Sequence, residues 1–205
     1  MNCGEPVAVV EKSVIAEEDL LRAEFYSLLA KLLSAAPDSQ QLASIGQLRG
    51  DDTTLGHAIE GLSRVAAGLG EGVVAEEYQS LFIGMGRGEL LPYGSYYLTG
   101  FLHEKPLAKL RSDMAELGAV RADSVSEPED HVACILEVMA GLITGRFGAP
   151  ASVAKQKDFF DAHIASWMDV FFRDLAGASS SVLYAALAEV GSRFLDIETA
   201  AFAMD

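Results

Sequence analysis

Helical periodicity, which runs along nearly the whole chain, constrains the fold most strongly. From Val14 to Leu33, and in later stretches, apolar residues recur at intervals of three and four, the spacing that places them on one face of an α-helix. No segment alternates like a half-buried strand, and no repeat of fixed period is present. The sequence therefore predicts an all-α, irregular helical bundle. The later helices are predicted around residues 42–48, 55–69, 74–82, 106–117, 132–143, 153–171 and 183–197.

Length and composition favour a single folded domain. The chain has 205 residues, of which half are hydrophobic and 22% are charged, so it can bury a substantial core. We expect residues 13–205 to form one all-helical domain after a flexible N-terminal tail, residues 1–12. The tail lacks the features of a secretory signal, and no apolar stretch reaches the ~20 residues that span a membrane. A cytoplasmic protein without stable membrane insertion is expected.

The charge balance restricts the possible partners. Thirty acidic residues against fifteen basic residues give a formal net charge of -15, which repels the phosphate backbone of a nucleic acid. Nucleic acid is therefore not expected as a partner. The same charge would attract a cationic peptide, although a negative surface also serves solubility alone.

The segment from Gly84 to Gly100 interrupts the helical pattern. It contains a run of closely spaced glycines, Pro92 and three tyrosines, and is predicted to be an ordered loop. The glycines do not form a dinucleotide or Walker motif, so a flexible turn explains them better than a phosphate site. Tyr93, Tyr96 and Tyr97 combine apolar rings with polar tips, which suits either packing or recognition.

A polar cluster precedes the apolar helix at residues 132–143. Ser126 and Glu129 have the spacing of a capping box, which predicts that the helix begins there. Glu127, Asp130, His131 and Cys134 lie within two helical turns, so a metal site is an alternative use of these side chains. No Cys-x-x-Cys pair supports that alternative.

A catalytic triad is not indicated. Ser95 lacks the Gly-x-Ser-x-Gly elbow of a nucleophilic serine. His163 lies beside a strongly apolar stripe next to Trp167, where a hydrogen-bonded core histidine is the expected role.

Several sequence blocks, in the same order, resemble the TorD/DmsD family of redox-enzyme maturation chaperones. The blocks Glu77–Gly84 and Pro92–Tyr97 are similar to its aromatic-x-x-Leu-Phe-x-Gly and Pro-aromatic-x-Ser-x-aromatic motifs. Glu127-Pro128-Glu129-Asp130-His131 matches its Glu-Pro-x-Asp-His motif, which is the most specific of the set. His163-x-x-x-Trp167 is similar to the family's His-x-x-x-Trp helix, so the resemblance spans roughly residues 20–197.

The resemblance implies an all-helical, TorD-like fold and a chaperone rather than an enzyme, with no cofactor. Its implied partners are a twin-arginine signal peptide and the apo form of a molybdopterin oxidoreductase catalytic subunit, held for cofactor insertion before export. Such a peptide presents a basic end and an apolar segment, so its receptor needs carboxylates and an apolar groove. Carried over position by position, the implied signal-peptide-binding residues are Tyr78, Leu81, Phe82, Tyr93, Ser95, Tyr97, Glu127, Pro128, Asp130 and His131.

Two questions stay open at this point. The alternative function is a small metal- or nucleotide-dependent enzyme that uses the cluster of Glu127, Asp130, His131 and Cys134. The sequence specifies neither the client enzyme nor whether the protein is a monomer or a homodimer. Tyr93 and Gly94 replace the tryptophan and the glutamate that some family members have, which leaves the peptide preference unspecified.

Overall fold

The chain forms α-helices joined by short connections. A computed structural model describes residues 15–119 and 127–204, and in these ranges the secondary structure is helical apart from one isolated bridge between Tyr93 and His131. The predicted all-α class is confirmed, whereas the predicted tail, residues 1–12, lies outside the described residues. None of the described helices is long and apolar enough to cross a bilayer. The helices are α1 (Glu17–Ser34), α2 (Ser39–Ile45), α3 (Thr54–Gly68), α4 (Glu71–Tyr78), α5 (Gly94–Thr99), α6 (Lys105–Glu116), α7 (Val132–Thr144), α8 (Val153–His163), α9 (Met168–Gly177) and α10 (Leu183–Phe202), with a π-helical turn, η1 (Gln79–Ile83), after α4.

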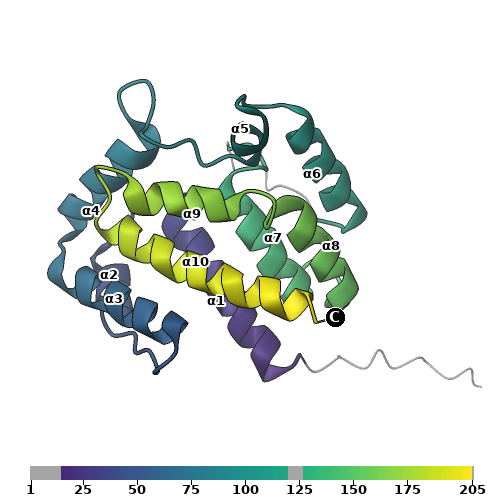
Figure 1. Ribbon diagram of the computed structural model, residues 1–205, viewed down its shortest axis with the longest axis horizontal. Helices are drawn as coiled ribbons and strands as arrows, with labels where there is room; N and C mark the ends of the chain where they lie inside the picture. The colour runs from purple at the N-terminus through teal and green to yellow at the C-terminus, as the bar shows by residue number, and fades with distance from the viewer. Residues whose placement is uncertain (1–14, 120–126, 205) are drawn as a thin grey trace, which may run out of the picture.

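Helix α7 forms the centre of the bundle. Ten of its 13 residues are buried, as expected for a helix that is apolar on all sides. Helix α1 packs along it, and α8 covers another side. Helix α10 packs against α3 and α9. In Figure 1, α2, α3 and α4 gather at one end of the molecule, and α5 and α6 lie at the other end beside α7 and α8.

A buried ion pair joins the first helix to the last. Both oxygens of Glu198, which is 1% exposed, accept hydrogen bonds from the Arg22 guanidinium, at 2.8 and 2.9 Å. The Tyr26 hydroxyl donates a further bond to Oε2 of Glu198, at 2.9 Å. This bidentate pairing stabilises the contact between α1 and α10 and also fixes their relative orientation.

A second buried carboxylate caps α10 from a distant part of the sequence. Glu77, on α4, accepts hydrogen bonds from the backbone N–H groups of Val182, Leu183 and Tyr184, at 2.7, 3.1 and 2.9 Å. The first N–H groups of a helix have no partner within the helix. Glu77 satisfies them and places a negative charge at the positive end of the helix dipole.

The glycine-rich turn after η1 is a structural requirement. Gly84 has φ of 61°, and a Cβ at this position would lie 1.9 Å from the carbonyl oxygen of Arg87. Any other residue would be strained in conformation and would also clash. The interpretation of these glycines as turn residues is confirmed.

Two predicted boundaries were wrong. The helix predicted over residues 153–171 is broken between His163 and Met168, so it forms α8 and α9. The apolar spacing continues through the break, and periodicity alone could not reveal it. The segment 84–100, predicted to be a loop throughout, contains the short helix α5, which ends at Gly100 in a left-handed conformation.

The predicted start of α7 was also wrong. Ser126 lies outside the described residues, but α7 begins at Val132, with His131 as its N-cap. His131 Nδ1 accepts the hydrogen bond from the Ala133 N–H at 3.2 Å. Glu129, which the capping box assigned to the helix start, instead forms an ion pair with Arg111 at 2.8 Å.

Candidate functional site

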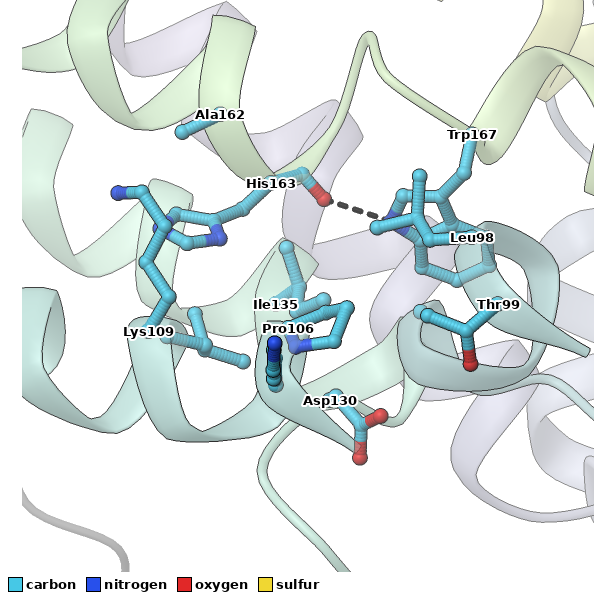
Figure 2. A pocket seen from close by; sticks show the side chains of 12 residues that line it. Leu98, Thr99, Pro106, Lys109, Asp130, Ile135, Ala162, His163 and Trp167 are labelled. Carbon is cyan, nitrogen blue, oxygen red and sulfur yellow. Dashed lines mark hydrogen bonds between the residues drawn. The ribbon is translucent and has the colours of Figure 1, made fainter. Parts of the chain in front are cut away.

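The described residues enclose a pocket of about 410 Å³ between α5, α6, the start of α7 and the break between α8 and α9. Its lining is mostly apolar, with one buried acidic residue and two lysines (Figure 2). Three separate parts of the sequence, residues 94–110, 130–135 and 162–167, therefore form its wall. The lining residues are Gly94, Leu98, Thr99, Lys105, Pro106, Lys109, Leu110, Asp130, Ile135, Ala162, His163 and Trp167.

A backbone bridge joins the two sequence motifs that border the pocket. The N–H of Gly94 donates to the carbonyl of Asp130 at 2.9 Å, and the N–H of Val132 donates to the carbonyl of Pro92 at 2.8 Å. These paired bonds fix the segment before α5 against the segment before α7. Residues that lie more than thirty positions apart in the sequence thus share one wall of the pocket.

Asp130 is the acidic residue of the pocket. It is 2% exposed, and its Oδ2 accepts a hydrogen bond from the Ser95 N–H at 2.9 Å. Its Oδ1 is buried and has no hydrogen-bond partner among the described residues. A buried polar atom without a partner costs about 1–3 kcal/mol, and more when it is charged. Asp130 therefore has a buried acceptor whose hydrogen-bonding capacity the fold leaves unused.

His131 acts as a helix cap in its neutral form. Its Nδ1 must carry a lone pair to accept the bond from Ala133. Burial lowers the pKa of His131 below the usual value for histidine, although Glu127 and Asp130 act in the opposite direction. The ring of Tyr93 lies edge-to-face against it, with centroids 5.2 Å apart.

The helix break places Trp167 and His163 on the wall opposite Asp130 (Figure 2). The indole Nε1 of Trp167 donates to the carbonyl of His163 at 2.8 Å, so it caps the end of α8. Gly94 makes room for this ring, since a Cβ there would lie 3.3 Å from Nε1 of Trp167. His163 is 6% exposed, and its Nε2 lies 2.6 Å from Asp113. The prediction of a hydrogen-bonded core histidine is confirmed.

Both lysines of the pocket belong to α6. Lys109 is paired with Asp113, which also binds His163. Lys105 is exposed at the first turn of the helix. Both lysines are exposed, whereas Asp130 is buried. The lining therefore combines exposed cations with a buried carboxyl group.

The structure does not bring all ten sequence-predicted residues together. Asp130 lines the pocket, and Ser95, wholly buried, supports it through its backbone N–H. A second group lies next to it around the backbone bridge: Tyr93 donates a hydrogen bond to Glu127, and His131 packs on Tyr93, with Pro128 half-buried nearby in the sequence.

The remaining predicted residues do not line the pocket. Tyr78 and Phe82 form an aromatic cluster with Tyr184, with centroids 5.0 to 5.8 Å apart. Leu81 is fully buried in the core. The ring of Tyr97 lies tilted against that of Trp167, with centroids 5.3 Å apart, and the Tyr97 hydroxyl donates to Asp174. Of these four residues, only Tyr97 is seen to contact a residue that lines the pocket.

Sequence reasoning missed most of the apolar lining. Leu98, Pro106 and Ile135 were counted as loop, helix-start or core residues, because their meeting depends on long-range packing. The His163-x-x-x-Trp167 pattern was the one available signal, since it marks the residues at the helix break.

The acidic cluster is not arranged as a metal site. Within residues 15–119 and 127–204, no three His, Cys, Asp or Glu side chains come together in a way that could hold a metal ion. Asp130 Oδ2 and His131 Nδ1 both accept bonds from the backbone. The geometry gives no support to the metal-dependent alternative.

Comparison with known proteins identifies relatives of the same kind over most of the chain. The family model described as nitrate reductase delta subunit matches residues 48–173. The chaperone protein TorD of Vibrio cholerae serotype O1 is 27% identical over 190 residues, covering 88% of this chain and 81% of that protein. TorD of Aliivibrio fischeri is 24% identical over 198 residues, covering 86% of this chain and 92% of that protein.

A solved structure has the same fold. The crystal structure of a protein assigned to redox enzyme maturation, from Archaeoglobus fulgidus, superposes with a TM-score of 0.54 at 19% sequence identity. The match covers 92% of this chain and 99% of that protein. Because the likeness extends over nearly all of both chains, the arrangement of the helices is shared as a whole.

Proposed function

We propose that the chain, which belongs to the TorD/DmsD family of redox-enzyme maturation chaperones, binds a signal peptide. This peptide is the twin-arginine signal peptide of a molybdopterin oxidoreductase catalytic subunit. It acts as a chaperone and not as an enzyme. In this role it works in the cytoplasm, where it holds the apo subunit until the cofactor has been inserted and export follows.

The observation that carries the proposal is Asp130, a residue in the wall of an apolar pocket whose buried Oδ1 has no hydrogen-bond partner among the described residues. An arginine side chain has an apolar stem and a planar guanidinium that donates several hydrogen bonds. The lining formed by Leu98, Ile135 and Trp167 suits the stem, and Asp130 suits the guanidinium. Charge-assisted bonds of this kind are about twice as strong as neutral ones.

The charge of the whole protein supports the same partner. A net charge of -15 draws a basic peptide toward the surface and raises its association rate. Lys105 and Lys109, the exposed lysines of the lining, oppose a second cation close to the first. The pocket therefore suits one arginine, and the neighbouring arginine of the pair would lie outside it, toward the exposed Glu127.

Isothermal titration calorimetry with a panel of twin-arginine signal peptides tests the proposal. At least one peptide should bind, and replacing both of its arginines by glutamine should weaken binding. Asp130→Asn removes the charge at nearly constant shape. Loss of one charge-assisted bond of about 1.5–3 kcal/mol corresponds to a dissociation constant roughly 10- to 150-fold larger.

Glu137→Gln provides the matched control, because Glu137 is an exposed acidic residue of α7 that does not line the pocket. It should leave the affinity within about twofold, as expected for an exposed charge. Equal affinities of the Asp130→Asn and Glu137→Gln variants, or no binding to any peptide of the panel, would contradict the proposal.

A further inference from the structure

The imidazole of His163, in the pocket wall, uses only one of its two nitrogens within the chain. Its Nε2 lies 2.6 Å from Oδ2 of Asp113, and no described residue forms a hydrogen bond with its Nδ1. Among the described residues, the fully buried side-chain atoms without a partner are Oδ1 of Asp130 and Oγ of Ser181, so Nδ1 of His163 keeps some accessible surface. Figure 2 shows a ring nitrogen of His163 turned toward the middle of the pocket that this residue lines.

Asp113 determines which nitrogen of this ring carries the proton. Its Oδ2 accepts hydrogen bonds from both Lys109, at 2.5 Å, and His163, at 2.6 Å. Burial acts to raise the pKa of Asp113, but the bonds from Lys109 and His163 outweigh it and hold the pKa below its usual value. An ionised carboxylate can only accept hydrogen bonds. The Nε2 atom of His163 must therefore be the donor in this contact.

The other nitrogen of the ring is then a hydrogen-bond acceptor. Burial lowers the pKa of His163 below the usual value of about 6.5, although the hydrogen bond to Asp113 acts in the opposite direction. The ring is therefore neutral near pH 7, and a neutral imidazole carries a single proton. With that proton on Nε2, the Nδ1 atom holds a lone pair. The pocket lining thus includes a neutral acceptor on His163 in addition to the carboxyl group of Asp130.

The surroundings of this acceptor suit an uncharged donor. The charge of Asp113 is balanced by Lys109, whose Nζ lies 2.5 Å from it and which also lines the pocket. A cation beside His163 would lose its hydration without a net negative charge to compensate for it, which is costly. A main-chain N–H or a hydroxyl does not incur this cost. Because Asp130 and His163 lie on opposite walls (Figure 2), the two acceptors differ in both position and charge.

We propose that Nδ1 of His163 accepts a hydrogen bond from an uncharged N–H or O–H group of the same peptide whose arginine binds at Asp130. This inference rests on the proposed function, because it requires a peptide in the pocket. One wall then takes the cation and the opposite wall takes a neutral donor. A peptide that satisfies both has one preferred direction, so His163 adds a selectivity that does not depend on charge.

Two substitutions of His163 separate its two nitrogens. His163→Asn places an amide oxygen where Nδ1 was and removes the contact made by Nε2, whereas His163→Gln keeps a donor for Asp113 and removes the acceptor. In calorimetry with a twin-arginine peptide that binds the wild type, His163→Gln should weaken binding at least about fivefold, because a buried donor of the peptide loses its partner. His163→Asn should stay within about twofold of the wild type. If loss of packing were the cause, the smaller asparagine would weaken binding as much or more.

His57→Gln is the matched control, since His57 is an exposed histidine of α3, a helix that contributes nothing to the pocket lining. It should leave the affinity within about twofold of the wild type. Thermal melts of all three variants verify that each is folded at the temperature of the titration.

Modified peptides identify the source of the donor. In one series each main-chain N–H in turn is replaced by an N-methyl group, and in the other each hydroxyl side chain is replaced by alanine. One replacement should weaken binding to the wild type at least about fivefold and have no further effect on the His163→Gln variant, as expected for two groups that contact each other. A hit in the first series assigns the donor to the main chain, and a hit in the second assigns it to a side chain.

Nitrogen NMR of the imidazole observes the same contact directly. In the free protein, Nδ1 of His163 should give the resonance of a nitrogen without a proton, and Nε2 that of a protonated nitrogen. The Nδ1 resonance should move upfield when the peptide binds, because the lone pair then accepts a hydrogen bond. A protonated Nδ1 in the free protein would contradict the inference.

The outcomes separate the two proposals. If no twin-arginine peptide binds the wild type, the proposed function itself is wrong. If Asp130→Asn weakens binding but His163→Gln behaves like His57→Gln, the function stands and the inference about His163 is wrong. Equal losses in the His163→Gln and His163→Asn variants would show that the ring acts only by packing, which also overturns the inference.

Discussion

Replacement of Glu77 by glutamine should cost a large part of the stability of this protein. Glu77 accepts three hydrogen bonds from the first N–H groups of α10, and it is 6% exposed. Oε1 binds the N–H groups of Val182 and Tyr184, and Oε2 binds that of Leu183. A glutamine can present one oxygen to the first two donors, but its NH₂ group must then face the N–H of Leu183.

The magnitude follows from these three contacts. One buried donor loses its partner, which costs about 1–3 kcal/mol, and the two remaining bonds lose their charge assistance, at roughly 0.5–1 kcal/mol each. The charge at the helix N-terminus contributes a further ~0.5 kcal/mol. Since these contributions overlap, we expect a loss of about 2–4 kcal/mol in the free energy of unfolding. For a chain of this size that corresponds to a Tm lower by roughly 5–15 °C.

Urea denaturation followed by circular dichroism measures this difference. The neighbouring residue offers a matched control, because Glu76 is exposed on the same helix, and Glu76→Gln should change the free energy of unfolding by less than about 0.5 kcal/mol. If Glu77→Gln is no more destabilising than Glu76→Gln, the idea that Glu77 anchors α10 is refuted.

Three further sets of substitutions should change the stability in ways that the structure predicts. Arg22→Ala leaves the buried Glu198 without its cation and should lower the free energy of unfolding by about 3–5 kcal/mol, whereas Arg193→Ala, which breaks an exposed pair, should cost less than about 1 kcal/mol in the same urea titration. Gly84→Ala should lower the Tm by several degrees or abolish soluble expression, because both φ and the space for a Cβ are unfavourable; an unchanged melt would contradict this. Burial lowers the pKa of His163, so the unfolded chain takes up the proton more readily, and stability should fall as the pH drops below ~6.5 and through the folded pKa; His163→Gln should flatten this slope, and an unchanged slope would show that other groups cause it.

The helices were predictable where local signals determine them. Apolar spacing located the interiors of all the long helices, and Pro106 and Gly118 marked the first turn and the end of α6 correctly. The break between His163 and Met168 was not predictable, because the apolar spacing runs through it and the turn depends on how Trp167 packs. The start of α7 was misplaced because a capping-box pattern competed with His131, whose capping role requires a neutral, buried ring.

The candidate site was predictable only in part. The motif around Asp130 and the position of Trp167 were available from the sequence, through the family resemblance. That Asp130 meets Leu98, Pro106 and Trp167 in one pocket depends on three parts of the sequence that come together only in the folded chain. The cap that Glu77 forms on α10 was not predictable for the same reason, since no residue near Val182 indicates a hydrogen-bond partner on α4.

The hydrogen bonds of the buried polar groups bear on the proposed position of the ligand. Glu77 and Glu198 are deeply buried, and each has its oxygens occupied by donors from elsewhere in the chain. Among the described residues, the buried side-chain oxygens without a partner are Oδ1 of Asp130 and Oγ of Ser181. A hydroxyl is the cheaper of the two to leave unsatisfied, because it carries no charge. Asp130 also lines the pocket described above, which supports the proposal that a cationic ligand binds there.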